Sequence, residues 1–255
     1  MKIIGSCHRT LTMCGGLSQV FGRFAAEGWF GERLPLEVRE PLSTFTLETE
    51  AGLVPIEVSI KGGKVTQVTT RMNCFVDELY RDGVHPLNLL GVRAYRVGKV
   101  LVVNADEVQR MSPVADVAQL DEKARTALID LQDRFLSDNC IRGEKSVEDF
   151  ALYDLHPERG GDARIVFPHN LRAMYVEPSC GTGSVAAAIA VCEDAGLTDR
   201  TMEISFESGG LLSLGGPEIT HVRLVARQGR IREASFHHSV VEPIAEGRVW
   251  ISVGQ

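Results

Sequence analysis

Two cysteines in this chain stand in the same kind of local sequence. Cys180 lies in the Gly-rich stretch 177–184, which leads into a run of small residues predicted to be helical, and Cys14 is followed by Gly15, Gly16 and a run with helical apolar spacing. The start of a helix has backbone N–H groups without internal partners and a partial positive charge. A thiol ionises more readily there, and a carboxylate is readily bound. The spacing therefore predicts two reactive thiols that act on a small carboxylate.

Two such cysteines facing each other could invert a carbon centre. A thiolate on one side of a bound amino acid would remove the α-proton, and a thiol on the other side would deliver a proton to the opposite face. The N–H groups of both helix starts would stabilise the enediolate charge. This chemistry needs no cofactor, and the glycines form neither dinucleotide-binding nor P-loop motifs. The alternative interpretation is two buried cysteines in ordinary β–turn–α units.

The composition is that of a globular protein. The chain has 255 residues, 44% apolar and 24% charged, with a net charge of −7, which suits one large domain or two lobes and does not indicate nucleic-acid binding. The six cysteines are scattered without a C-x-x-C pair, so we expect reduced thiols, no disulfide framework, no metal site and a cytoplasmic location. Neither a signal peptide nor a membrane-spanning segment is predicted.

The elements that must position the cysteines follow from periodicity and turn residues. Helices are predicted over 17–28, 120–136 and 184–195, with a helix cap at 104–107. Strands are predicted at 36–39, 43–49, 54–60, 65–70, 163–167, 173–176, 202–206, 211–214, 221–225 and 247–253. Two more strand runs are predicted within 92–103, with residues 97–99 between them. A hairpin is predicted at 61–64, a turn at 82–86 and a loop over 142–162. The order of cysteine, turn, helix and terminal glycine occurs twice, which favours two lobes of similar design.

The motifs around the two cysteines resemble those of a known family. Met13-Cys14-Gly15-Gly16 resembles the first-cysteine motif of proline racemases, and the stretch 178–184 resembles the second. The stretch 177–183 and Glu207-Ser208-Gly209-Gly210 are also similar to histidine racemases of the same diaminopimelate-epimerase-like fold. The resemblance implies an α+β fold of two pseudo-symmetric lobes, each a central helix wrapped by mostly antiparallel sheet. The first lobe would be 1–86 with a returning strand at 246–255, and the second 87–245.

The resemblance also implies a pyridoxal-phosphate-independent amino-acid racemase or epimerase. Its catalytic pair would be Cys14 and Cys180, and its substrate would be an amino acid, with no cofactor. A homodimer is possible, and neither nucleic acid nor a membrane is an expected partner. The implied substrate-binding residues are Gly15, Gly16, Glu177, Gly181, Thr182, Gly183, Gly209 and Gly210.

This sequence departs from the family pattern at several positions. Gly16 replaces the usual histidine or asparagine, and Val176 replaces an aspartate that contacts the substrate amine, which leaves Glu177 as the candidate for that role. These changes argue against proline and hydroxyproline as substrates. Thirteen residues precede Cys14, fewer than in the family. Either the start is truncated, or the first lobe is built differently, or the protein is not a complete enzyme.

Other interpretations stay open at this point. Hydroxyproline dehydratases of the same fold carry threonine in place of the second cysteine, so Cys180 argues against that reaction. A non-catalytic small-molecule binding protein that lacks part of the first lobe is another alternative, and a redox role for the two thiols is a weaker one. His237-His238 fits a strand or loop pair better than a metal site, and Cys192 fits a helix core position.

Overall fold

The computed structural model describes residues 3–4, 10–11, 13–31, 35–111, 121–137, 147, 149–167, 179–196, 199–211 and 218–238. Within these ranges the chain forms a small two-stranded sheet and an eleven-stranded sheet in the order β3-β4-β5-β13-β12-β11-β10-β9-β8-β7-β6. The strands are β1 Ile3–Ile4, β2 Thr10–Leu11, β3 Leu42–Thr49, β4 Gly52–Lys61, β5 Lys64–Arg71, β6 Val84–Leu89, β7 Val92–Val97, β8 Val100–Asn104, β9 Asp149–Asp154, β10 Ala163–Val166, β11 Thr201–Ser208, β12 Glu218–Arg227 and β13 Arg230–His238.

Five helices accompany the sheets in the described part of the chain. They are α1 Gly15–Ala26, α2 Asn73–Asp82, α3 Ala105–Met111, α4 Glu122–Ser137 and α5 Gly181–Asp194. Among the described strand pairs, β8–β9 and β10–β11 are parallel and the others antiparallel. The expected α+β class with a large, mostly antiparallel sheet is therefore confirmed.

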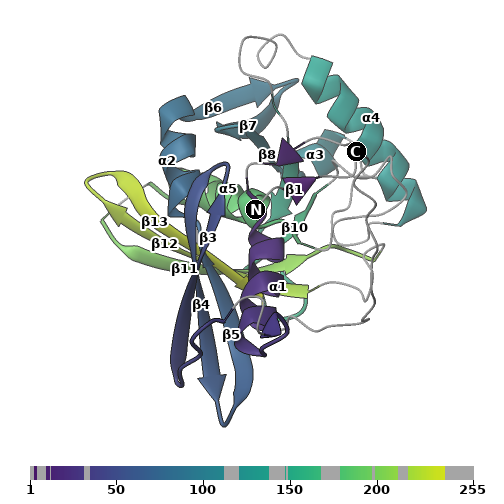
Figure 1. The fold of residues 1–255 in the computed structure, drawn as a ribbon. Coiled ribbons are helices and arrows are strands. Elements are labelled where there is room, and N and C mark those ends of the chain that lie inside the picture. The colour runs from purple at the N-terminus through teal and green to yellow at the C-terminus, as the bar shows by residue number, and fades with distance from the viewer. Residues whose placement is uncertain are drawn as a thin grey trace, which may run out of the picture.

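Two parts of the large sheet, β3 to β5 and β13 to β6, join where β5 pairs with β13. These strands pair antiparallel over three residues, with Phe236 opposite Thr70. On one side of this junction lies the meander β3-β4-β5, against which α1 packs (Figure 1). On the other side the sheet continues from β13 to β6, and α5 packs against β7, β8, β9, β12 and β13 near the centre of the molecule (Figure 1). The β5–β13 junction thus brings the surroundings of the two helices together.

The part of the sheet around β8 and β9 is covered on both faces. In β8, Val100 and Val102 belong to the core that includes α5, whereas Leu101 and Val103 belong to a second core with α3 and α4. Such strands read as continuous apolar runs because both faces are buried. Figure 1 shows α3 and α4 together on one side of the molecule. The second core therefore covers the face of β8 and β9 that is turned away from α5.

Helix α5 is fixed along its length and at its carboxyl end. Its alanines from Ala186 to Ala188 are completely buried, as expected for a helix surrounded by protein. At its end, Asp194 accepts hydrogen bonds from the hydroxyls of Tyr95 at 2.5 Å and Tyr153 at 3.1 Å, and it forms an ion pair with Arg93 at 2.9 Å. These contacts tie the helix to β7 and β9 and so fix where its amino end points.

Most predicted elements are confirmed. The helix over 17–28 is α1, the hairpin at 61–64 joins β4 and β5, and Asn104 caps α3 by accepting from the N–H of Asp106 at 2.8 Å. The apolar face predicted for 120–136 is buried in α4. The predicted strands at 173–176 and 247–253 and most of 211–214 lie outside the described residues.

Three predictions of local structure are wrong. Residues 36–39 form no strand. The turn predicted at 82–86 contains the start of β6, which tolerates Pro86 because it is the edge strand of the sheet. The loop predicted over 142–162 contains β9, whose five consecutive buried residues from Phe150 to Asp154 lack the alternation of a half-buried strand.

Candidate active site

Cys14 and Cys180 occupy equivalent positions, each at the N-cap of a helix. Cys14 has φ −141° and ψ 113°, and Cys180 has φ −129° and ψ 116°. Both carbonyl groups accept the first intrahelical hydrogen bond, from the N–H of Ser18 at 3.1 Å and of Ser184 at 2.8 Å. Both cysteines are partly buried and neither forms a disulfide. The two motifs singled out from the sequence therefore fold in the same way.

The starts of α1 and α5 touch each other. Gly15 and Gly181, which follow the two cysteines, are both buried. A Cβ atom added to Gly15 would lie 3.1 Å from the Cα of Gly181, and one added to Gly181 would lie 3.0 Å from the Cα of Gly15. Only residues without side chains allow this approach. The positive ends of both helix dipoles therefore converge on one place, at which the two cysteines are the N-cap residues.

The β5–β13 junction lies beneath this contact. An atom of the Phe236 ring would be 3.4 Å from a Cβ on Gly15 and 3.2 Å from one on Gly181. The side-chain amide of Gln19 donates to the carbonyl of Phe236 at 2.9 Å, and the hydroxyl of Thr70 donates to the carbonyl of Gly15 at 3.2 Å. Both helix starts are thus held against the same pair of strands.

The thiol of Cys180 lies within its own helix start. Its Sγ accepts a hydrogen bond from the N–H of Gly183 at 3.4 Å and is 3.2 Å from Oγ1 of Thr182, where either atom can be the donor. Both groups can donate to a thiolate, so this environment suits the ionised form. Gly183 must be glycine because a Cβ there would come within 2.4 Å of the Phe167 ring. Thr182 is partly buried beside the thiol.

The other predicted site residues are Gly16, Gly209, Gly210 and Glu177. A Cβ atom added to Gly16 would meet nothing within 4 Å, and Gly209 and Gly210 are buried with φ of 105° and 65° at the carboxyl end of β11. The N–H of Gly209 donates to the carbonyl of Ile165 in β10 at 3.2 Å. Glu177 lies outside the described residues.

One polar group near Cys180 was missed from the sequence. Nε2 of His238 lies 2.9 Å from the hydroxyl of Ser179, the residue before Cys180, and its Nδ1 lies 3.2 Å from Glu218. His237 points to the opposite face of β13, where its ring stacks on that of His221 with centroids 4.6 Å apart. The alternation of a strand separates the two histidines, which was the available signal against a joint metal site.

The other described cysteines are packing residues. The thiol of Cys74 donates to the sulfur of Met13 at 3.7 Å. Cys192 contacts Met202 in the core, and burial raises the pKa of its thiol to about 12, as expected for an unreactive cysteine. Among the described residues, no three His, Cys, Asp or Glu side chains are grouped as metal ligands would be. No described helix has the length and apolar character needed to span a bilayer.

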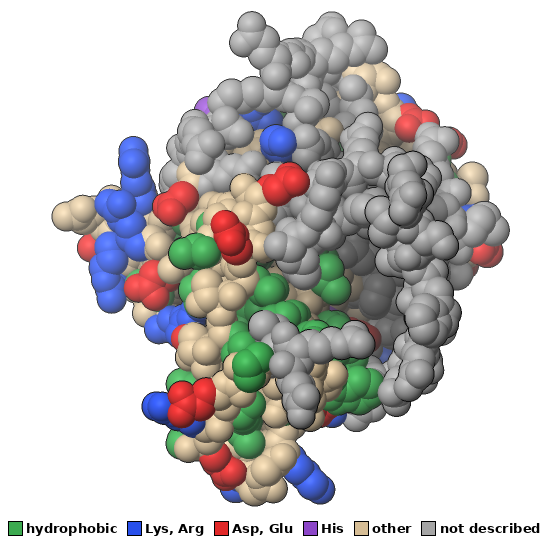
Figure 2. Space-filling model, viewed as in Figure 1, with side chains coloured by type: hydrophobic (Ala, Val, Ile, Leu, Met, Phe, Trp, Pro, Cys, Tyr) green, Lys and Arg blue, Asp and Glu red, His purple; other side chains and the backbone are tan. Residues whose placement is uncertain are grey.

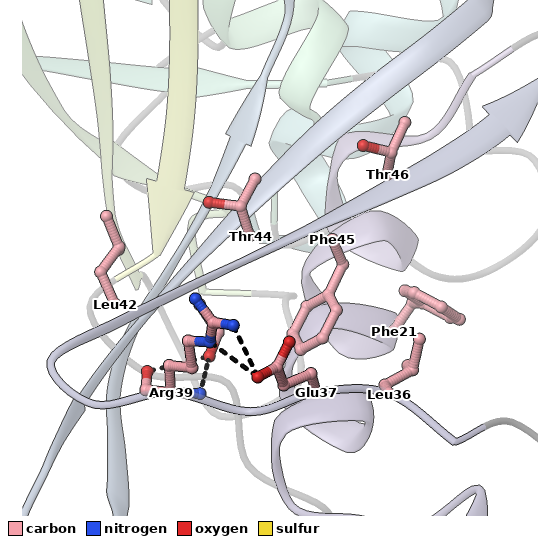
Figure 3. A pocket seen from close by; sticks show the side chains of 9 residues that line it. Phe21, Leu36, Glu37, Arg39, Leu42, Thr44, Phe45 and Thr46 are labelled. Carbon is pink, nitrogen blue, oxygen red and sulfur yellow. Dashed lines mark hydrogen bonds and ion pairs between the residues drawn. The ribbon is translucent and has the colours of Figure 1, made fainter.

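Two surface cavities lie away from the cysteines. One of about 590 Å³ lies between α1 and edge strand β3; Figure 3 shows Phe21, Leu36 and Phe45 close together in it, with the ion pair of Arg39 and Glu37 at 2.7 Å beside them. Figure 2 shows hydrophobic side chains gathered in the lower part of the view. A second cavity, of about 430 Å³, contains His221 and His237 on the outer face of the sheet. Neither of these two cavities is lined by Cys14 or Cys180.

Comparison with known proteins identifies the fold. No protein-family model and no curated protein matches the sequence. Similar solved structures are a hydroxyproline epimerase from Agrobacterium vitis with bound trans-4-hydroxy-L-proline (TM-score 0.59, 17% identity, covering 93% of this chain and 67% of that chain) and a probable proline racemase from Agrobacterium radiobacter K84 with bound carbonate (0.57, 17%, 92% and 67%). A methylitaconate-Δ-isomerase is also similar (0.50, 15%, 95% and 76%). The chain therefore has the proline racemase-like fold that its motifs predict.

Proposed function

We propose that this protein is an isomerase that inverts the α-carbon of an amino acid without pyridoxal phosphate. The single observation that carries the proposal is the contact of Gly15 with Gly181, which joins two helices that are each N-capped by a cysteine. The fold shared with a hydroxyproline epimerase and a probable proline racemase supports the same class of reaction.

In the proposed reaction the two thiols act from opposite sides. The thiolate of one cysteine takes the α-proton, which leaves a carbanion whose charge spreads onto the substrate carboxylate. The other cysteine, which began as the thiol, then gives its proton to the opposite face of the carbon and becomes the thiolate. The exchanged protons balance, so each turnover reverses the ionisation of the pair. For the opposite enantiomer the roles exchange.

The helix starts supply the electrostatic part of the mechanism. The first N–H groups of α1 and α5 point to the same place, where they would bind the carboxylate and stabilise the enediolate as it forms. In α5 these groups belong to Gly181, Thr182 and Gly183, and in α1 to Gly15 and Gly16. Glu177 remains the proposed partner of the α-ammonium group, and Gly209 and Gly210 are proposed to line the site.

The division into lobes belongs to the same proposal. We place α1 with β3, β4 and β5 in a first lobe of residues 1–86, completed by 246–255, and α5 in a second lobe of 87–245. The shared geometry of the two cysteine N-caps and the position of the helix contact at the β5–β13 junction support a pseudo-symmetric arrangement.

The test is a survey of single enantiomers. The purified protein is incubated with each L-amino acid and each D-amino acid, and the enantiomeric composition is followed by chiral chromatography. We expect inversion of at least one amino acid in both directions, without added pyridoxal phosphate. If folded protein inverts none of them, the proposal is wrong.

A further inference from the structure

His238 lies on the face of the sheet that carries the candidate active site. Side chains alternate along a strand, so His238 shares its face of β13 with Phe236, whose ring touches both helix starts. The two rings meet edge to face, with centroids 5.0 Å apart. Opposite His238 on β12 is Thr220, which is completely buried. His238 is therefore part of the polar lining next to the meeting point of α1 and α5.

His238 lies between Glu218 and Ser179, the residue before Cys180. Its Nδ1 lies 3.2 Å from Oε2 of Glu218, and its Nε2 lies 2.9 Å from the hydroxyl of Ser179. The side chain of His238 is 10% exposed, whereas that of Glu218 is 43% exposed. A carboxylate on one ring nitrogen fixes the orientation of the imidazole and the bond formed by the other nitrogen. Because the imidazole is shielded from water, its bond to Ser179 is stronger than a surface hydrogen bond.

The bond between His238 and Ser179 restrains the backbone just before the N-cap of α5. Ser179 is covalently joined to Cys180, so holding the Ser179 side chain restrains the place where the chain enters α5 and hence the direction of the Cys180 thiol. An error of about 1 Å in the position of a reacting group can cost about 100-fold in rate. We propose that His238, oriented by Glu218, is a positioning residue for Cys180 and acts through Ser179; this rests on the proposed function of Cys180 as an acid–base group.

The first helix start is built differently. The residue that precedes Cys14 is Met13, which is buried and accepts a hydrogen bond from the thiol of Cys74. A thioether cannot take the place of the Ser179 hydroxyl in a histidine-linked chain. The effect of His238 is therefore directed to the Cys180 half of the site, and Cys14 serves as an internal reference in the same molecule.

The test compares His238→Leu with His238→Gln. The leucine removes the bond to Ser179, whereas the glutamine amide can replace Nε2 in that bond. We expect His238→Leu to lower kcat by about 10- to 100-fold with little change in KM, and His238→Gln to recover most of the loss. Ser179→Ala should have the same effect as His238→Leu, and the double variant should be no worse than either. His237→Gln, on the opposite face of the same strand, is the matched control and should leave kcat unchanged.

A second measurement does not depend on turnover. The rate of alkylation of Cys180 by iodoacetamide is followed by peptide mass spectrometry, with Cys14 in the same sample as reference. We expect His238→Leu and Ser179→Ala to change the rate at Cys180 at least several-fold and to leave Cys14 unchanged, with circular dichroism confirming the fold. Equal changes at both cysteines, no change at Cys180, or additive effects of the two substitutions on that rate would overturn the proposal. If no amino acid is inverted, the proposed function fails, but the alkylation result still decides the role of His238 in positioning.

Discussion

Gly15 and Gly181 are in van der Waals contact through their backbones, at the starts of two helices that are far apart in sequence. A Cβ on either residue would lie 3.0 to 3.1 Å from the Cα of the other. The neighbour in each case is backbone, which cannot move aside as the end of a long side chain can. The contact brings two cysteine N-caps to one place, and the proposed pairing of their thiols depends on it.

Substitution of the contact glycines should separate the helix starts. We expect Gly15→Ala and Gly181→Ala each to lower the free energy of unfolding by about 1–3 kcal/mol, as overpacking does, and to abolish inversion. Gly16→Ala is the matched control, because a Cβ there meets nothing within 4 Å and alanine favours a helix. Its stability should be unchanged or higher by up to about 1 kcal/mol. Urea denaturation measures these differences; equal effects at Gly15 and Gly16 would contradict the account.

The ring of Phe236 should matter for activity beyond its share in the core. Phe236→Leu keeps most of the volume and should cost less than about 1.5 kcal/mol in stability, yet the loss of the ring edge beneath Gly15 and Gly181 should reduce the rate of inversion. Phe150→Leu is the control, since Phe150 is equally buried in the core on the α3–α4 side. A loss of rate in both variants in proportion to stability would assign Phe236 a packing role alone.

His237 should make the protein less stable in mild acid. Burial, together with the neighbouring His221 and His238, lowers the pKa of His237 to about 4. The unfolded chain, in which histidine titrates near pH 6.5, binds this proton more readily than the folded protein does. Stability is therefore expected to fall as pH decreases from about 6.5 towards 4. The slope of unfolding free energy against pH should be smaller in His237→Gln than in the unsubstituted protein, as measured by urea denaturation between pH 4 and 7; an equal slope would contradict the prediction.

Glu207 should stabilise the turn that leads into β10. Burial raises the pKa of this carboxyl, but hydrogen bonds from the backbone N–H groups of Glu158, Arg159 and Gly161 outweigh it, and the net shift is downward. The lowered pKa means that its contribution is present above about pH 4.5 and is lost as the carboxylate is protonated. We expect Glu207→Gln to lower the free energy of unfolding by about 1–3 kcal/mol at pH 7 and by much less at pH 3.

The control for Glu207 is on the same strand. Glu203 has a side chain that is 77% exposed and a distant ion pair with Arg223 at 3.7 Å, so Glu203→Gln should change stability little at either pH. If Glu207→Gln lowers the free energy of unfolding by the same amount at pH 7 and pH 3, the charge of the carboxylate does not contribute to stability.

The sequence was most informative where local chemistry decides structure. A cysteine followed by glycine and a helical run predicted that both thiols lie at helix starts, although Thr182 or Ser184 was expected to cap the second helix and Cys180 does so. The pair of glycines predicted the hairpin at 61–64, and helical apolar spacing predicted the buried face of α4. In contrast, β9 was predicted as loop because the stretch 142–162 is polar and contains Gly, Pro and His, while Phe150 to Tyr153, buried on both faces, lack a period of two. Long-range packing, not local pattern, makes that segment a strand.

In the candidate site, too, local sequence predicts some features and long-range packing decides the others. The two cysteines and their glycines could be found from sequence because each motif is contiguous. The link of Ser179 to His238 could not, since it joins residues 59 positions apart through the packing of α5 against β13. The contact of Gly15 with Gly181 likewise depends on the three-residue register between β5 and β13, which no local pattern predicts.

The central claim is that Cys14 and Cys180 act as two separate acid–base groups on opposite faces of one α-carbon. Early turnover in deuterated water, with one enantiomer of a substrate amino acid, tests it most directly by mass spectrometry of the separated enantiomers. The account predicts that the product carries deuterium at the α-carbon while the remaining substrate keeps its proton, and that Cys14→Ser and Cys180→Ser each abolish inversion. Equal deuterium in substrate and product from the start, or inversion that survives either substitution, would contradict it.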